Sequence, residues 1–301
     1  MEKKSGFVSV IGRPNVGKST LMNMIVDEKI TITSDKPQTT RNRIRCIYTD
    51  PNRGQIVFSD TPGIQKPKNS LGRYMEGVTD YSVRDCDLIL WMIEPDNFVG
   101  TKDSLIASKL IDITVPVILV INKIDRIKKE KILPVIEAFK DLFPFRAIIP
   151  ISARTGEGVK ELLDELFDAL PEGVEFFPED EITDQPVRQI VAEMIREKAL
   201  NLLSEEIPHG IAVLIESFRE NEENGVTDID ALIYCEKDSH KGIIIGKGGS
   251  MIKKIGHDAR LEIEKLLQNK VFLTLNVKVK KNWRQSDILI KNFGYKKEDE
   301  A

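Results

Sequence analysis

Residues 7–26 read FVSVIGRPNVGKSTLMNMIV, and this stretch decides the fold of the first half of the chain. The run FVSVIG is typical of a buried strand, and the run STLMNMIV is typical of a helix. Between them Gly12, Gly17, Lys18 and Ser19 complete the pattern GxxxxGK[ST]. A strand, a glycine-rich loop and a helix in this order predict a phosphate-binding loop, because backbone N–H groups and a helix N-terminus point at one anion.

The same alternation of short apolar runs and amphipathic stretches continues to about residue 170. The runs IVFSD, LILWMI, VPVILVIN and AIIPIS each precede a turn and a helix-like segment. This pattern predicts an α/β domain with a mainly parallel sheet. The runs RIRCIYTD and QIVFSD flank a turn at Pro51–Gly54, so we expect one antiparallel strand at the sheet edge.

A second domain is expected after a linker. Residues 171–186 are rich in proline and acidic residues and have no helical or strand period. We therefore expect a first domain over 1–170 and a second over 187–301, which closes with a helix near Trp283 and the charged tail KKEDEA. The expected order of the second domain is a helix over 187–203, strands over 211–218 and 228–235, a short helix, a glycine-rich turn, a helix over 251–267 and a strand.

Composition excludes several classes of protein. The chain has 301 residues, 44 Lys+Arg against 48 Asp+Glu and a net charge of −4. Its three cysteines, Cys46, Cys86 and Cys235, form no CxxC pair, so neither a disulfide framework nor a structural zinc site is indicated, and a reducing cytoplasm is expected. The longest apolar runs, 88–93 and 115–121, are too short to cross a bilayer, and no signal-length run opens the chain.

The charges are unevenly distributed along the chain. Residues 157–240 hold 23 acidic and 6 basic side chains, whereas residues 241–297 hold 14 basic and 4 acidic ones. A basic segment attached to an acidic body predicts a polyanionic partner.

The motif Asp60-Thr-Pro-Gly63 follows the strand run IVFS. The phosphate-binding loop would place Lys18 at the β- and γ-phosphates of a nucleotide and Ser19 on Mg²⁺. The Asp60 carboxylate can hold Mg²⁺ through water, while the N–H of Gly63 meets the γ-phosphate.

The motif Asn122-Lys123-Ile124-Asp125 ends the run VPVILVI and predicts a guanine site. The Asp125 carboxylate can accept two hydrogen bonds from guanine N1–H and N2–H₂, which adenine cannot offer, so GTP is favoured over ATP. Ser152 and Ala153, at the end of AIIPIS, would complete the pocket by presenting backbone N–H to guanine O6.

The ordered set GRPNVGKS, DTPG, NKID and SA resembles the translation-factor-like GTPase superfamily over about residues 7–170. The resemblance implies a six-stranded P-loop GTPase domain, and it makes Gln38-Thr39-Thr40-Arg41 the first switch, in which Thr40 joins Mg²⁺ and the γ-phosphate. The implied metal ligands are Ser19, Thr40 and Asp60. The implied catalytic set is Asn15, Lys18, Thr40, Asp60 and Gly63. The implied nucleotide-binding set is Gly12, Arg13, Pro14, Asn15, Val16, Gly17, Lys18, Ser19, Thr20, Thr40, Asp60, Gly63, Asn122, Lys123, Asp125, Ser152 and Ala153.

One residue departs from the best-known small GTPases. Ile64 follows DTPG where they carry the glutamine that orients the attacking water, and its side chain cannot hydrogen-bond. The subgroup with a hydrophobic residue here often pairs it with Pro-Asn in the phosphate loop and uses K⁺. We therefore expect that Asn15 helps to hold K⁺ and that intrinsic hydrolysis is slow.

The run Lys241-GIIIGKGGSMIKKIG contains GxxG between two apolar helical stretches. The order of elements around it resembles the type II KH domain, whose loop clamps about four nucleotides of single-stranded nucleic acid. Glycines allow close phosphate approach, lysines supply charge, and the helix from Ser250 offers its N-terminus. The expected RNA-binding residues are Lys241, Gly246, Lys247, Gly248, Gly249, Lys253 and Lys254.

A GTPase with these motifs joined to a type II KH domain in about 300 residues resembles the Era-like GTPases. The resemblance implies a monomer that binds GTP or GDP with Mg²⁺, binds 16S ribosomal RNA of the small subunit and no DNA, acts in 30S subunit assembly, and is often peripherally attached to the membrane. We expect GTP to order Thr40 and the Gly63 loop and so to control RNA access.

Two other readings remain open. In one, a membrane-associated regulatory GTPase docks a protein or anionic lipid through its C-terminal domain. In the other, the chain is a small-molecule phosphotransferase, which the NKID motif disfavours because such an enzyme does not need guanine recognition.

Overall fold

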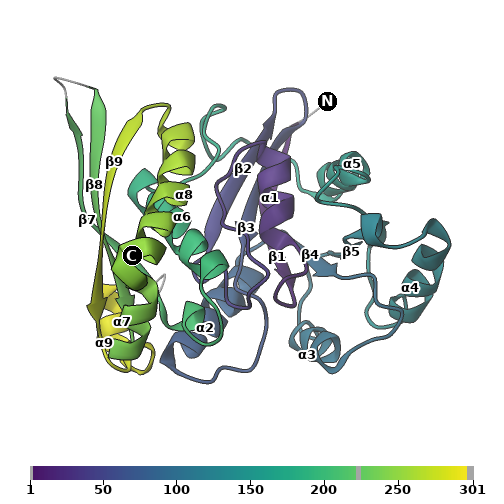
Figure 1. Cartoon of the computed structure of the whole chain (residues 1–301). Coiled ribbons are helices and arrows are strands. Elements are labelled where there is room, and N and C mark those ends of the chain that lie inside the picture. The colour runs from purple at the N-terminus through teal and green to yellow at the C-terminus, as the bar shows by residue number, and fades with distance from the viewer. Residues whose placement is uncertain (1–2, 222–224, 297–301) are drawn as a thin grey trace. The chain divides into compact units, whose positions relative to one another are not determined.

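The computed structural model describes residues 3–221 and 225–296 of the chain (Figure 1). The predicted charged tail, apart from Lys296, lies outside the described residues. The chain divides into two compact units. The N-terminal unit comprises residues up to 31, 40–66 and 75–184, and the C-terminal unit comprises residues 32–39, 67–74 and those from 185 onward.

The N-terminal unit contains a six-stranded sheet with the order β2-β3-β1-β4-β5-β6. Only the β2–β3 pair is antiparallel, and β2 lies at the sheet edge, so the predicted mainly parallel sheet with one antiparallel edge strand is confirmed. The strands are β1 (Lys4–Gly12), β2 (Ile44–Asp50), β3 (Gly54–Asp60), β4 (Leu88–Ile93), β5 (Val117–Ile121) and β6 (Ala147–Pro150).

Helices cover both faces of this sheet (Figure 1). Strand β4 is buried at every residue, which its unbroken apolar run LILWMI requires of a strand with both faces covered. Leu88 and Leu90 face one core with α1 and α5, while Ile89 and Trp91 face the other with α3 and α4. The helices are α1 (Lys18–Val26), α2 (Ser70–Arg84), α3 (Thr101–Lys109), α4 (Ile132–Phe139) and α5 (Val159–Ala169).

Of the expected linker at 171–186, residues up to 184 are grouped with the N-terminal unit. The side-chain oxygen of Gln55 accepts hydrogen bonds from the N–H groups of Phe176 (2.9 Å) and Phe177 (3.0 Å). The guanidinium of Arg45 pairs with Asp184 at 2.7 Å. This segment therefore bonds to both strands of the edge hairpin, to Arg45 on β2 and to Gln55 on β3.

The C-terminal unit has a three-stranded sheet of order β7-β8-β9, in which β7–β8 is antiparallel and β8–β9 is parallel. Helices α6 and α8 pack their apolar faces on one core with this sheet. The elements are α6 (Val187–Leu202), β7 (Ala212–Asn221), β8 (Val226–Cys235), α7 (Asp238–Ile245), α8 (Ser250–Leu267), β9 (Lys270–Val279) and α9 (Asp287–Asn292). Their order matches the KH-like order expected from the sequence.

The two early segments grouped with the C-terminal unit, 32–39 and 67–74, were not anticipated there. In the first, the N–H of Thr33 donates to Glu197 of α6 at 2.8 Å. In the second, the hydroxyl of Ser70 donates to the carbonyl of Gln285 at 3.2 Å. These segments adjoin, in the sequence, the two loops that the motifs assign to the γ-phosphate.

Candidate nucleotide site and candidate RNA loop

The phosphate-binding loop joins β1 to α1, and its backbone requires glycine at close contacts. Gly17, which precedes the first residue of α1, has φ 101°, and a Cβ on it would lie 2.2 Å from the amide nitrogen of Asn122. Asn15 also has a positive φ of 68°. A glycine-containing loop that leads directly into a helix is the arrangement in which backbone N–H groups can bind one anion.

Three oxygen-bearing side chains meet at the start of α1 and the end of β3. The Ser19 hydroxyl donates to Asp60 Oδ2 at 2.7 Å and lies 3.1 Å from the Thr40 hydroxyl, which is 3.3 Å from the same carboxylate oxygen. The other oxygen, Asp60 Oδ1, is buried and has no hydrogen-bond partner among the described residues. Hydroxyl and carboxylate oxygens are the ligands that Mg²⁺ prefers, so the set fits this ion.

The charges at this point are buried in the protein. Lys18 is 6% exposed and Asp60 is fully buried. Burial lowers the pKa of Lys18 and raises the pKa of Asp60, although each group's attraction for the other opposes the shift. Burial disfavours both the Lys18 ammonium and the Asp60 carboxylate. A phosphate beside Lys18 and a cation beside Asp60 would therefore each stabilise a buried charge.

The predicted guanine-binding residues lie together at the ends of β5 and β6. Asn122 donates to the Val16 carbonyl (2.8 Å) and accepts from the Ala153 N–H (2.9 Å), so it ties the phosphate loop to the base loop. The Ser152 hydroxyl donates to Asp125 at 2.7 Å. Asp125 remains exposed, which leaves its carboxylate accessible to a base.

Lys123 also connects the two loops and has a partner that sequence reasoning missed. Its ammonium donates to the Asn15 carbonyl at 2.6 Å and pairs with Glu94, the residue directly after β4. Arg13 of the phosphate loop pairs with Asp96 at 2.7 Å and with the fully buried Asp103 at 3.5 Å. The sequence signal that could have revealed Glu94 was its place directly after β4, a strand that lies next to β1.

Gly63 and Ile64 explain how the DTPG loop sits beside the phosphate loop. A Cβ on Gly63 would lie 2.7 Å from the nitrogen of Pro14, so only glycine allows this approach. The N–H of Ile64 donates to the Gly12 carbonyl at 3.1 Å. The Ile64 side chain is 7% exposed and belongs to the apolar core with Ile11 and Trp91. It is therefore a packing residue that supplies no group to orient water.

Four of the predicted RNA-binding residues, Gly246 to Gly249, form the loop between α7 and α8 of the C-terminal unit. Gly246, Gly248 and Gly249 all have positive φ, of 74°, 60° and 77°. No atom lies within 4 Å of a Cβ built on Gly248, so its backbone is open to a ligand. Lys247 is exposed, as are two further lysines on the first turns of α8.

The remaining predicted residues lie on the two helices that flank the loop. Lys253 and Lys254 are the exposed lysines of α8, and Lys241 on α7 is half-buried. Ile244 is fully buried, whereas Ile243 is 51% exposed beside the loop. The N-terminal unit thus brings the predicted nucleotide set together, and the C-terminal unit contains the predicted RNA set.

Each unit matches a known family. Residues 7–123 match the family described as 50S ribosome-binding GTPase, and residues 206–284 match the KH domain family. The chain is 54% identical to GTPase Era of Ruminiclostridium cellulolyticum, covering 98% of this chain and 99% of that protein. It is 53% identical to GTPase Era of Clostridium kluyveri, covering 97% and 99%.

Solved structures agree over nearly the whole chain. A crystal structure of Era in complex with MgGDPNP and nucleotides 1506–1542 of 16S ribosomal RNA matches with a TM-score of 0.94 at 41% identity, covering 97% of this chain and 99% of that one. An Aquifex aeolicus Era variant bound to GDP and AlF₄⁻ matches with the same score, identity and coverage. With likeness this extensive in both sequence and structure, the chain belongs to the Era family of GTPases, which hydrolyse GTP.

Proposed function

We propose that this protein is a GTP-hydrolysing switch that binds 16S ribosomal RNA of the small subunit through its KH loop and acts in 30S subunit assembly. The observation that carries the proposal is the open Gly246–Gly249 loop, with exposed Lys247, in the same chain as a nucleotide site. The Era structure in complex with a 16S segment matches 97% of this chain, which supports the small subunit as the partner. The family description of residues 7–123 names the large subunit instead.

Crosslinking to RNA in cells, followed by sequencing of the bound RNA, tests this proposal. The wild type is compared with a Lys247→Asp, Gly248→Asp variant, which places two negative charges where phosphates would approach. Lys265→Asp is the matched control, because Lys265 is an exposed lysine toward the other end of α8. GTP hydrolysis and the fluorescence of the buried Trp283, measured in parallel, report on the folding of the N-terminal and C-terminal units respectively.

Enrichment of one small-subunit rRNA site that the loop variant loses and the control keeps would support the proposal. A diffuse signal, or one equal in all three proteins, would contradict it and would favour the alternative in which the C-terminal domain docks a protein or anionic lipid.

In the nucleotide site we propose the roles that the motifs imply. Lys18 and Gly63 would contact the phosphates, Asp125 would select guanine, and Ser19, Thr40 and Asp60 would hold Mg²⁺, which supplies charge neutralisation when it is bound. The support is the meeting of the three oxygen-bearing side chains and the orphaned Asp60 oxygen.

We further propose that K⁺ assists hydrolysis and that Asn15 helps to hold it. The support is the core position of Ile64, which leaves no side-chain donor at the place of the usual glutamine, and the exposed position of Asn15 on the phosphate loop. Hydrolysis is measured in K⁺ and in Na⁺ at equal ionic strength, for wild type and Asn15→Ala. Equal wild-type rates in the two salts would refute the proposal.

We also propose that the protein is cytoplasmic, with a fraction held peripherally on the inner face of the membrane. The support is the excess of basic residues after residue 240, which anionic lipids attract. Among the described residues no helix is long and apolar enough to span a bilayer. Fractionation before and after a high-salt wash tests this location, because salt releases an electrostatically bound protein.

The nucleotide state is proposed to control RNA binding through the segments 32–39 and 67–74. Within the C-terminal unit Arg196 donates to the Thr39 carbonyl, and the rings of Tyr74 and Tyr295 lie 5.8 Å apart. Thr39 directly precedes Thr40, so a change at one affects the backbone of the other. RNA affinity is measured with GDP and with a non-hydrolysable GTP analogue. Identical affinities would contradict the control of RNA binding by the nucleotide, because a ligand that binds two conformational states equally does not shift the equilibrium between them.

A further inference from the structure

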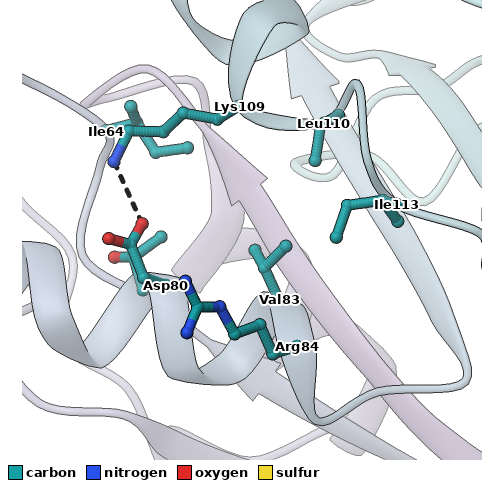
Figure 2. A pocket seen from close by; sticks show the side chains of 8 residues that line it. Ile64, Asp80, Val83, Arg84, Lys109, Leu110 and Ile113 are labelled. Carbon is teal, nitrogen blue, oxygen red and sulfur yellow. Dashed lines mark hydrogen bonds and ion pairs between the residues drawn. The ribbon is translucent and has the colours of Figure 1, made fainter.

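A pocket of about 190 Å³ lies in the N-terminal unit, between the C-terminal half of α2 and the end of α3 (Figure 2). Its apolar part is made by Ile64, Val83, Leu110 and Ile113. None of these residues belongs to the proposed nucleotide set. The pocket is therefore separate from the nucleotide-binding residues, although it borders the residue that follows Gly63.

The size and lining limit what the pocket can hold. A dry apolar cavity of about 150 Å³ holds one benzene ring, so this one accommodates a single ring with a short substituent and excludes a nucleotide. The four apolar residues offer no metal ligands and no hydrogen-bond donors, so the polar groups of the pocket are those of Thr79, Asp80, Arg84 and Lys109. The occupant must have an apolar body.

The charged groups at the rim select the rest of the ligand. Lys109 of α3 is already paired with residues of α2, because its ammonium lies 3.0 Å from Asp80 (Figure 2) and 3.1 Å from Glu76. The guanidinium of Arg84 makes no hydrogen bond or ion pair with any residue that the structure describes. A free guanidinium above an apolar floor complements a carboxylate, which it binds through two parallel N–H donors.

Two lining residues connect the pocket to the DTPG loop. The hydroxyl of Thr79 donates to the Pro62 carbonyl at 3.1 Å, and the N–H of Ile64 donates to the Gly12 carbonyl at 3.1 Å. A ligand in contact with Ile64 therefore presses on the loop that contains Asp60 and Gly63. Any movement of this loop between GDP and GTP states would change the shape of the pocket.

We propose that this pocket binds a small organic carboxylate with a single-ring apolar body and that its occupancy is linked to the bound nucleotide through Ile64. By the reciprocity of binding equilibria, the nucleotide then alters the affinity for the carboxylate to the same degree that the carboxylate alters the affinity for the nucleotide. The proposal adds a second ligand site to the GTPase and is independent of RNA binding.

The test uses phenylacetate as the probe and the δ1 methyl NMR signals of Ile64 and Ile113 as reporters, with phenylacetamide as the neutral isostere. We expect saturable shifts with phenylacetate at millimolar concentration. Arg84→Gln should weaken phenylacetate about tenfold and leave phenylacetamide unchanged, because it removes only the charge partner of the carboxylate. Ile113→Trp, which fills the pocket, should abolish the Ile64 shift.

Each variant is first shown to bind GDP as wild type does, so loss of folding is detected separately. The absence of a saturable Ile64 shift in the wild type would overturn the site. An unchanged phenylacetate affinity in Arg84→Gln would overturn the assignment of the ligand class. Equal phenylacetate affinities with GDP and with a GTP analogue would overturn the link to the nucleotide.

Discussion

Replacing Arg196 by Gln should strongly destabilise the C-terminal unit. Arg196 lies on α6 with no exposed surface, donates to the Thr39 carbonyl and pairs with Glu193 one turn earlier. Burial acts to lower the pKa of Arg196, but Glu193, together with Tyr295 and Glu197, raises it above its ordinary value, so the guanidinium stays charged. The glutamine variant would leave the Glu193 carboxylate unpaired and the Thr39 carbonyl without its donor.

Removing one partner of a buried ion pair costs about 3–5 kcal/mol. The Glu193 side chain is 16% exposed and can recover some hydration, so we expect the lower end, about 3 kcal/mol. Arg188→Gln on the same helix is the matched control. Its guanidinium donates to the Ile215 and Glu216 carbonyls, but the side chain is exposed, and the expected cost is below about 1 kcal/mol.

Urea unfolding measures both variants. Trp283 is fully buried in the C-terminal unit, so its fluorescence in a Trp91→Phe background reports on that unit. The double variant Glu193→Gln, Arg196→Gln should cost at least about 1.5 kcal/mol less than the sum of the single variants, because it removes both charges together. The buried ion pair would be refuted as a source of stability if Arg196→Gln lost no more free energy of unfolding than Arg188→Gln. It would also be refuted if the losses of the Glu193 and Arg196 variants were strictly additive.

Three further outcomes follow from the structure. Asp125→Asn should weaken GDP about tenfold or more relative to xanthosine diphosphate, as measured by nucleotide competition, and unchanged base preference would exclude Asp125 from the guanine site. Burial raises the pKa of the Cys86 thiol from its ordinary 9.0 to about 12, so above pH 9.0 the folded chain keeps a proton that the unfolded chain releases, and the contribution of Cys86 to stability falls as the pH rises. Iodoacetamide at pH 8 should therefore label Cys86 far faster in urea than in the native protein. Equal labelling rates, seen by mass spectrometry, would contradict this burial. Gly77→Ala within α2, where a Cβ meets nothing within 4 Å, should raise the free energy of unfolding by about 0.5–1 kcal/mol. Gly17→Ala should lower the free energy of unfolding and weaken GDP binding. A destabilised Gly77→Ala variant would contradict the position of Gly77 within this helix.

The fold of each unit was largely predictable because local patterns carry the information. Parallel strands buried on both faces read as unbroken apolar runs, and LILWMI and VILVI are such strands here. The GxxxxGK[ST] loop forms where a strand leads into a helix, and α1 begins at Lys18 as that pattern requires. Composition did not reveal that residues 171–184 join the first unit, because contacts such as the pairing of Asp184 with Arg45 depend on the packing of the edge hairpin.

Much of the candidate site was also predictable, since its motifs lie at the carboxyl ends of parallel strands, which meet at one edge of the sheet. The partners of these motifs were not predictable. Glu94, Asp96 and Asp103 hold Lys123 and Arg13, yet none of them stands in a motif. Only the packing of α3 and the loop after β4 brings these carboxylates to the phosphate loop.

The phosphate loop, the guanine-binding motif and the glycine-rich loop of the second unit can be identified from sequence, because each depends on backbone geometry within a few consecutive residues. Tertiary structure alone decided that Ile64 lies in the apolar core, that Arg196 bonds the Thr39 carbonyl, and that a pocket opens between α2 and α3. These features join residues that are distant in the sequence, and their contacts exist only once the helices are packed on their sheets.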